Sequence, residues 1–292
     1  MPLPLNRRQF NRIFAAGLAG LTLRPTLFAQ TRVPVPRLGC QTDLENAAAV
    51  KAAGGSWVGL SVANWLNPGG PETEFLANID AASSAPLPVL AVNSFIRPKH
   101  LKVTGPEANH SEVLAYCALA IKRAQRAAVG MITFGSGGSR KIPADFNREQ
   151  AFDQFINFLK LLGPVAADHD VIVNVEQLQT RECNFINTIA EAERVVRGAD
   201  HPHIGAVADF YHMAAEGDTP GDLARAMDII NHVEIAELED RRVPGTNGQD
   251  FRPYLKVLKD AGYTGAIGIE GRFQLSELKT GFDEITRQWN EA

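Results

Sequence analysis

Four acidic side chains stand at the ends of four successive apolar runs in the C-terminal half of the chain. They are Glu176, Asp209, Glu234 and Glu270. Each run is short and rich in β-branched residues, and a segment of helical character follows it. In a parallel α/β barrel, strand ends of this kind converge on one mouth, where the chemistry takes place. Converging carboxylates repel one another unless a cation lies between them, so the pattern predicts a divalent metal site.

Eight short apolar runs predict the strands that would position these residues. Their continuous apolar character is typical of strands buried on both faces, and helical segments lie between them. We therefore expect an α/β fold, a single-domain (β/α)8 TIM barrel over residues 31–292. The predicted strands span residues 37–41, 57–62, 88–93, 129–134, 171–176, 204–209, 233–236 and 266–270, and the predicted helices span residues 43–53, 110–127, 146–169, 184–198, 220–227, 250–262 and 275–290.

Residues 1–30 follow the order of an export signal. Arg7 and Arg8 precede Phe10, and a mildly apolar stretch then leads to small residues around Ala29. This is the order of a secretory peptide, and the paired arginines resemble the twin-arginine signal. We expect a periplasmic or secreted protein that has no membrane association after export. The alternative is an amphipathic N-terminal helix on a cytoplasmic protein.

The charge balance argues against a nucleic-acid partner. The chain has 292 residues and a net charge of −4, and its first 29 residues carry four arginines and no acid. The remainder therefore stands at −8 and contains no basic run, which is unlike a nucleic-acid-binding protein. Cys40, Cys117 and Cys183 are widely spaced and form no metal-ligand pattern, so we expect buried free thiols.

Several motifs in the second half resemble the xylose isomerase-like TIM barrels. Within these, the nearest branch is the sugar phosphate isomerases and epimerases, which includes hydroxypyruvate isomerase and D-tagatose 3-epimerase. The resemblance implies a metal-dependent reaction on a small sugar or hydroxy-carbonyl compound. It also leaves open a homo-oligomer that pairs through its helices. The motifs are residues 176–187, 209–213, 234–241 and 262–270.

In that family a divalent cation, usually Mn²⁺ or Mg²⁺, is held by Glu, Asp, His and Glu on strands five to eight. These positions fall on Glu176, Asp209, Glu234 and Glu270, so Glu234 stands where the family has His. His232 lies two residues earlier, roughly 6.6 Å lower in the barrel, and is not expected to replace that ligand. An all-oxygen set favours Mn²⁺, Mg²⁺ or Ca²⁺, with Co²⁺ and Zn²⁺ as alternatives. The other outcome is a weakened or lost metal site.

The resemblance implies a reaction that removes a proton next to a carbonyl, with the metal stabilising the enediolate as a Lewis acid. Glu176 and Glu270 would be the catalytic acid and base, and His212 and Arg241 would bind the substrate. The leading hypothesis is therefore a metal-dependent sugar isomerase or epimerase that acts on an unphosphorylated ketose or a related hydroxy-carbonyl compound.

Three alternatives remain at this stage. A lyase or dehydratase on a keto-sugar, keto-glycoside or inosose would begin with the same proton removal. A non-catalytic sugar-binding barrel would account for the departure at Glu234. A nuclease related to the apurinic endonucleases would need more metal-binding histidines and a basic face. The glycine-rich loop at residues 135–138 offers backbone N–H groups to an anion, but such a loop alone is weak evidence for a phosphate site.

Overall fold

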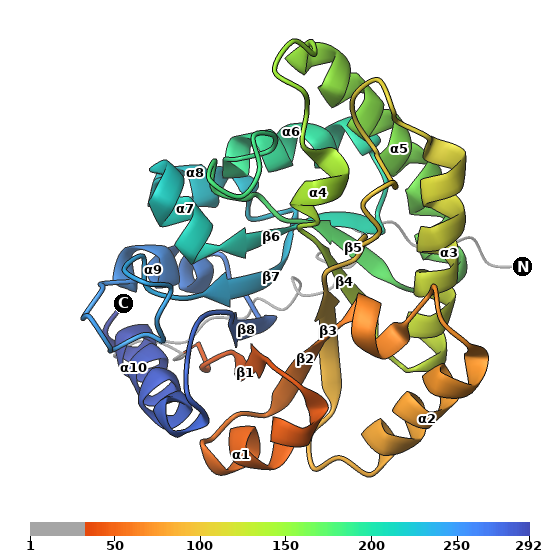
Figure 1. The fold of residues 1–292 in the computed structure, drawn as a ribbon. Helices are drawn as coiled ribbons and strands as arrows, with labels where there is room; N and C mark the ends of the chain where they lie inside the picture. The colour runs from red at the N-terminus through yellow and green to blue at the C-terminus, as the bar shows by residue number, and fades with distance from the viewer. Residues whose placement is uncertain (1–32) are drawn as a thin grey trace, which may run out of the picture. The chain divides into compact units, whose positions relative to one another are not determined.

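The computed structural model describes residues 33–292, and the expected export signal lies outside these residues. Eight parallel strands close into a barrel in sequence order, and helices surround it (Figure 1). Each strand lies within three residues of its predicted bounds, so the predicted (β/α)8 barrel is confirmed. The strands are β1 (Arg37–Gln41), β2 (Trp57–Ser61), β3 (Val89–Asn93), β4 (Met131–Phe134), β5 (Ile172–Val175), β6 (Ile204–Asp209), β7 (Ile230–Ile235) and β8 (Ala266–Ile269).

All seven predicted helical segments form helices, and the structure adds further ones that the sequence analysis missed. The predicted set consists of η1 (Leu44–Asn46) with α1 (Ala47–Ala52), α3 (His110–Arg126), α5 (Arg148–Asp168), α6 (Ile189–Ala199), α8 (Pro220–Ala226), α9 (Arg252–Asp260), and η3 (Leu275–Glu277) with α10 (Leu278–Glu291). The additional segments are η2 (Val62–Leu66), α2 (Glu72–Ser83), α4 (Gly137–Arg140) and α7 (Phe210–Glu216).

Helix α6 begins five residues later than the sequence predicted. Thr188 caps it, because its side chain accepts a hydrogen bond from the backbone N–H of Glu191 at 3.3 Å. Residues 184–187 belong instead to the loop after β5, where the side-chain amide of Asn187 donates to the carbonyl of Leu178 at 2.6 Å. This loop is therefore folded upon itself above the barrel, which fixes the residues that follow β5.

A buried tryptophan fills the barrel interior on the side away from the mouth. Trp57 stands at the start of β2, and its ring packs edge-on against His232 with centroids 5.6 Å apart. A Cβ at Gly39 would lie 2.3 Å from the Trp57 ring, and one at Gly268 would lie 2.7 Å from it. The two glycines thus leave the space that the ring needs, and the ring closes the barrel interior at this end.

The three cysteines are buried and form no disulfide, as the sequence predicted. Burial raises the pKa of the Cys40 thiol to about 12 and that of Cys117 well above its usual value. Both groups therefore stay protonated and serve as packing residues. Across residues 33–292, no helix combines the length and the apolar character that crossing a membrane requires.

Candidate active site at the barrel mouth

Strands β5 to β8 bring the four carboxylates together. Glu176 directly follows β5, Asp209 ends β6, Glu234 lies near the end of β7, and Glu270 directly follows β8. Asp209 and Glu234 are register partners across β6 and β7. One oxygen from each of the four side chains lies within 4.8 Å of those of the other three. The structure therefore gathers all four residues that the sequence analysis singled out as metal ligands.

Burial makes this cluster electrostatically costly. Burial first, and then repulsion from Glu270 and Asp209, raises the pKa of Glu176 well above its usual value. Burial and the neighbouring carboxylates also raise the pKa of Glu234 well above its usual value. Burial raises the pKa values of Asp209 and Glu270 as well, although the nearby guanidinium of Arg241 opposes the shift in both. The cluster is thus poised to take up protons or a cation.

Arg241 supplies one positive charge to the cluster. Its Nη2 donates to Glu270 Oε2 at 2.9 Å and to Asp209 Oδ2 at 3.3 Å. The guanidinium also lies over the Tyr211 ring, 4.6 Å from its centroid. One guanidinium cannot balance four carboxylates, so a negative excess remains wherever the acids are ionised. The sequence analysis expected Arg241 near the substrate, and the structure places it at the mouth.

The loop that carries Arg241 is held by a buried glutamate. Glu237 is fully buried, and its carboxylate accepts backbone N–H bonds from four residues of the loop after β7. Arg241 itself has a φ of 54°, in the left-handed region, and its carbonyl accepts from the N–H of Arg272 at 2.7 Å. Glu237 therefore organises the loop, and Arg241 is fixed from both sides. The four donors to Glu237 are Gly245, Asn247, Gly248 and Gln249.

His212 is oriented as a proton donor. Its Nδ1 accepts a hydrogen bond from the backbone N–H of Gln179 at 3.1 Å, so in the neutral ring the proton resides on Nε2. Nε2 lies 3.5 Å from Asp209 Oδ2 and 3.6 Å from Glu176 Oε1. Burial, helped by the charge of Arg241, lowers the pKa of His212 to about 4. In this tautomer Nε2–H can donate to a bound molecule, and in the other tautomer His212 could join Glu176 and Asp209, with which it forms a second group of possible metal-holding residues.

His232 lies beneath the carboxylates rather than among them. Its Nε2 is 3.6 Å from Glu234 Oε1, and its ring packs against Trp57. The ligand group formed by the four carboxylates does not include His232. This agrees with its position two residues earlier on β7.

Two side-chain amides in the site were missed by sequence reasoning. Asn93 donates to Glu270 Oε1 at 2.6 Å, and Gln41 donates to Glu234 Oε1 at 3.2 Å. Both end an apolar strand, β3 and β1 respectively, just as the carboxylates end or follow theirs. The same sequence signal could therefore have found them. Each neutral amide supports one carboxylate without adding charge.

The glycine-rich loop has a packing explanation. A Cβ at Gly135 would lie 2.0 Å from Glu176 Oε2, so this position must lack a side chain for Glu176 to occupy its place. Glu182, also missed by the sequence analysis, lies 3.6 Å from Arg241 Nη1. The loop after β4 and the loop after β5 thus shape the mouth together.

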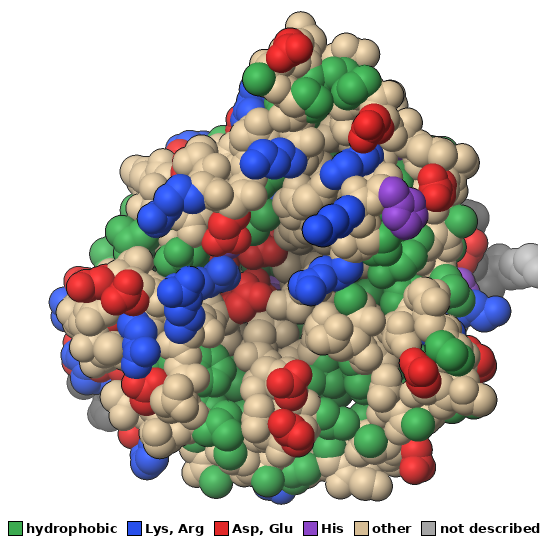
Figure 2. Space-filling model, in the orientation of Figure 1, with side chains coloured by type: hydrophobic (Ala, Val, Ile, Leu, Met, Phe, Trp, Pro, Cys, Tyr) green, Lys and Arg blue, Asp and Glu red, His purple; other side chains and the backbone are tan. Residues whose placement is uncertain are grey.

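A cavity of about 430 Å³ opens above the carboxylates, within the usual range of small-ligand sites. In Figure 2 acidic side chains lie in a hollow near the centre of the face, and basic side chains surround it. The cavity is lined by side chains from several strand ends and loops, which is the usual construction of a barrel active site. Among them are Asn93, Arg97, Lys99, Glu176, His212, Arg241 and Glu270.

The donor set fits a hard divalent cation. Glu234 Oε2 is buried, and no group among residues 33–292 donates a hydrogen bond to it. Its partner oxygen, Oε1, receives the bond from Gln41. Four carboxylates offer only oxygen ligands, which suit Mg²⁺, Mn²⁺ or Ca²⁺ better than a soft metal. A cation would satisfy the unpaired oxygen and offset the mutual repulsion.

A model of the xylose isomerase-like TIM barrel matches residues 47–287 of this sequence. The chain belongs to the xylose isomerase-like TIM barrel family. This family membership confirms the resemblance on which the sequence analysis relied. It also agrees with the closed barrel and with the carboxylates at its mouth.

Part of the chain is similar in sequence to proteins of known name. The chain is 34% identical over 123 residues to the 3-dehydro-D-guloside 4-epimerase of Escherichia coli (strain K12), covering 41% of this chain and 45% of that protein. The chain spans about half the length of the curated relatives it matches.

Solved structures of the same fold reach further along the chain. The E. coli 3-keto-D-glucoside 4-epimerase covers 86% of this chain and 99% of its own, with a TM-score of 0.73 and 20% identity. The IolI protein with a bound zinc atom covers 87% of this chain and 98% of its own, with a TM-score of 0.68 and 16% identity. These neighbours share the barrel architecture.

Proposed function

We propose that this protein is a divalent-metal-dependent isomerase or epimerase of a small hydroxy-carbonyl compound of the sugar class. The observation that carries the proposal is the cluster of four carboxylates, three buried and one half-buried, beside a neutral histidine and an arginine, around one cavity. The names of the relatives support the same class, since they are epimerases and isomerases.

Glu176 and Glu270 are the proton-transferring pair in this proposal. A carboxylate whose pKa is raised by burial is a stronger base, and its acid form persists nearer to neutral pH. One glutamate removes the proton next to the carbonyl, and the other returns a proton. Return to the opposite face of the same carbon gives epimerisation, whereas return to the neighbouring carbon gives isomerisation.

The four carboxylates Glu176, Asp209, Glu234 and Glu270 would hold the metal, with Mn²⁺ or Mg²⁺ favoured by the all-oxygen donor set. When bound, a divalent cation supplies Lewis-acid polarisation of the substrate oxygens. The unpaired Glu234 Oε2 and the solved relative with a zinc atom support a metal here.

His212 and Arg241 position the substrate in this proposal. His212 presents its Nε2–H to the cavity, and the neutral ring donates without adding charge. Arg241 offers a planar guanidinium beside Glu270, where it can orient a carbonyl or hydroxyl oxygen. Both groups are already held by backbone or aromatic contacts, so little order must be gained when the substrate binds.

Deuterium exchange tests the proposal. The purified protein, loaded with Mn²⁺ or Mg²⁺, is incubated in D₂O with a panel of ketoses, keto-sugar acids and hydroxypyruvate, and exchange of the carbon-bound proton is followed by NMR. Metal content is measured by plasma mass spectrometry. We expect exchange with conserved product mass, and a loss of about 100-fold or more in Glu176→Gln.

Glu45→Gln is the matched control, because Glu45 is exposed on η1 and lines neither the mouth cavity nor the cavity beside it, and its variant should exchange like the parent. Release of water or an aglycone would instead identify the lyase that the sequence left open. Absence of exchange with every compound, in protein shown to contain the metal, would contradict the proposed chemistry.

A further inference from the structure

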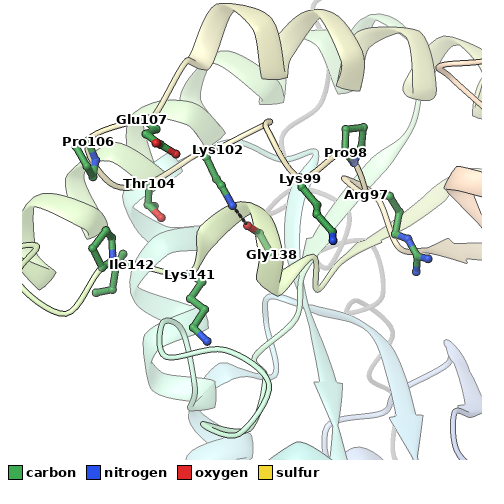
Figure 3. A pocket seen from close by; sticks show the side chains of 11 residues that line it. Arg97, Pro98, Lys99, Lys102, Thr104, Pro106, Glu107, Gly138, Lys141 and Ile142 are labelled. Atoms are coloured by element: carbon green, nitrogen blue, oxygen red, sulfur yellow. Dashed lines mark hydrogen bonds between the residues drawn. The ribbon is translucent and has the colours of Figure 1, made fainter.

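A second cavity, of about 630 Å³, adjoins the mouth on the side of β3 and β4 (Figure 3). Four basic side chains line it: Arg97, Lys99, Lys102 and Lys141. Arg97 and Lys99 also line the mouth cavity, together with Gly138, so the two cavities share a wall. A single ligand could therefore reach from the carboxylates into this basic cleft.

The basic cleft has a firm frame. The loop after β3 is bonded to the segment around α4 by several hydrogen bonds. The N–H of Ile96 donates to Ser136 Oγ at 2.9 Å, and the N–H of Val103 donates to the carbonyl of Ser139 at 2.7 Å. Lys102 Nζ donates to the carbonyl of Gly138 at 2.7 Å. The cations therefore extend from a backbone that is already ordered.

The cleft carries an unbalanced positive charge. Among residues 33–292, none of its four cations takes part in an ion pair, and Glu107 is the sole acidic residue that lines it. Elsewhere among residues 33–292 some lysines pair, as Lys256 does with Asp260, whereas others such as Lys122 and Lys160 take part in no ion pair. The cleft differs because it gathers four such cations in one cavity. This concentration of unpaired cations stands out on a chain whose net charge is −4. A local positive potential of this kind attracts anionic ligands.

The side chains share a direction. Figure 3 shows Arg97, Lys99 and Lys141 extending to the same side of the cleft, with their cationic ends away from the loop backbone. A Cβ added at Gly138 would meet no atom within 4 Å, so the backbone beside these cations is open to a ligand. Guanidinium and ammonium groups are the usual partners of carboxylate and phosphate oxygens.

We propose that the basic cleft binds an anionic group, a carboxylate or a phosphate, that the substrate carries at a distance from its reacting carbonyl. This rests on the proposed function of the mouth. The four carboxylates there repel an anion, so such a substrate binds in one orientation. Its anionic end lies against Lys99 and Lys141, and its carbonyl end enters among the four carboxylates. The substrate class becomes a keto-sugar acid or keto-sugar phosphate, whereas the sequence analysis expected an unphosphorylated ketose or a related hydroxy-carbonyl compound.

Three compounds with one carbon skeleton test this inference: D-fructose, D-fructuronate and D-fructose 6-phosphate. Their binding to the full metal-loaded chain is measured by ligand-observed NMR titration at low salt. We expect at least one of the two anionic compounds to bind about tenfold or more tightly than D-fructose, with the advantage shrinking as salt rises. The anion that binds better identifies a carboxylate or a phosphate as the natural group.

The variant Lys99→Gln/Lys141→Gln should lose most of this advantage, measured in the same protein as the ratio of the affinity for the anionic compound to the affinity for D-fructose. The single variant Lys99→Gln provides a milder version should the pair perturb the fold. Lys122→Gln/Lys160→Gln is the matched control, because it removes the same charge from exposed positions on α3 and α5 that line neither cavity. It should keep the full advantage.

Two results would overturn the inference. One is that neither anionic compound binds more tightly than D-fructose, undetectable binding included. The other is an equal loss in the control, which would assign the effect to overall charge. Failure of deuterium exchange with the anion preference intact would overturn only the proposed chemistry, whereas intact exchange without the preference would overturn only the basic cleft.

Discussion

Glu234 is the residue on which the proposed metal preference of the mouth depends. The side chain is fully buried on β7, one of its oxygens receives a bond from Gln41, and the other has no donor among residues 33–292. Burial and its acidic neighbours raise the pKa of Glu234, so the group gains from binding either a proton or a cation. A histidine at this point would offer a neutral nitrogen instead. The proposed ligand set is thus harder and more negative than the set that the resemblance implies.

Glu234→His should shift metal preference toward zinc. Replacement of an anionic oxygen by an imidazole nitrogen weakens Mn²⁺ and Mg²⁺ binding and favours Zn²⁺. The protein is equilibrated with equal concentrations of Mn²⁺ and Zn²⁺, and the bound metals are counted by plasma mass spectrometry. We expect the bound Zn to Mn ratio to rise about tenfold or more relative to the parent.

Glu234→Gln is the control for this change, because it removes the charge and keeps an oxygen donor. It should weaken the binding of both metals without the turn toward zinc. An unchanged ratio of bound Zn to bound Mn in Glu234→His would show that Glu234 is not a ligand. The metal site would then be formed by the other three carboxylates.

For individual residues, the sequence predicted the position of those side chains that stand at the end of a strand. Glu176, Asp209 and Glu270 could be placed because a barrel directs the end of each strand to the same mouth. The proton position on His212 could not be, because it depends on the N–H of Gln179 in a loop whose path is set by tertiary contacts. The pairing of Arg241 with the carboxylates likewise depends on the loop after β7.

Among the elements, β1, β2 and β8 are fitted to one side chain. Trp57 is almost fully buried, and its Nε1 donates to the carbonyl of Arg37 at 3.2 Å. Gly39 on β1 and Gly268 on β8 face the ring closely enough that neither has room for a Cβ. Glu270 directly follows β8, and Glu234 lies on its neighbour β7, so this packing also supports these two carboxylates of the mouth.

Gly39→Ala should destabilise the barrel. Its Cβ would lie 2.3 Å from the Trp57 ring and 2.4 Å from the Trp57 carbonyl oxygen, so both side chain and backbone must move. Overpacking of this kind costs about 1–3 kcal/mol or more in the free energy of unfolding. Urea unfolding followed by circular dichroism measures it.

Gly130→Ala is the matched control, because a Cβ at Gly130 meets no atom within 4 Å. That variant should stay within about 0.5 kcal/mol of the parent. Equal stability of both variants would show that the strands around Trp57 can yield without cost, and would contradict the close fit described here.

The sequence predicted elements whose pattern is strong and missed those whose pattern is weak. The strands are continuous apolar runs, and all eight were found. Helix α2 was missed because Phe75 is its only buried residue, which leaves no apolar stripe to detect. Helix α7 was missed because it begins directly after β6, where Asp209 both ends the strand and caps the helix.

For the whole molecule, the proposed property is its cellular location, which rests on the sequence of residues 1–30. The barrel has buried free thiols and no disulfide among residues 33–292, so its stability does not depend on an oxidising compartment. A twin-arginine signal exports folded proteins, and a metal site built from buried carboxylates would be filled before export. We propose export by this route on the sequence of residues 1–30, in which Arg7 and Arg8 precede a mildly apolar stretch.

Export should depend on the paired arginines. The full chain is expressed in a bacterium that has the twin-arginine pathway, and the periplasmic and cytoplasmic fractions are compared by immunoblot. Arg7→Lys/Arg8→Lys keeps the charge but removes the motif. It should lower the amount of periplasmic protein to about a tenth or less of the parent's amount. Arg24→Lys lies outside the pair and should be exported normally. Retention of the parent chain in the cytoplasm would contradict the signal and favour the amphipathic helix that the sequence left as the alternative.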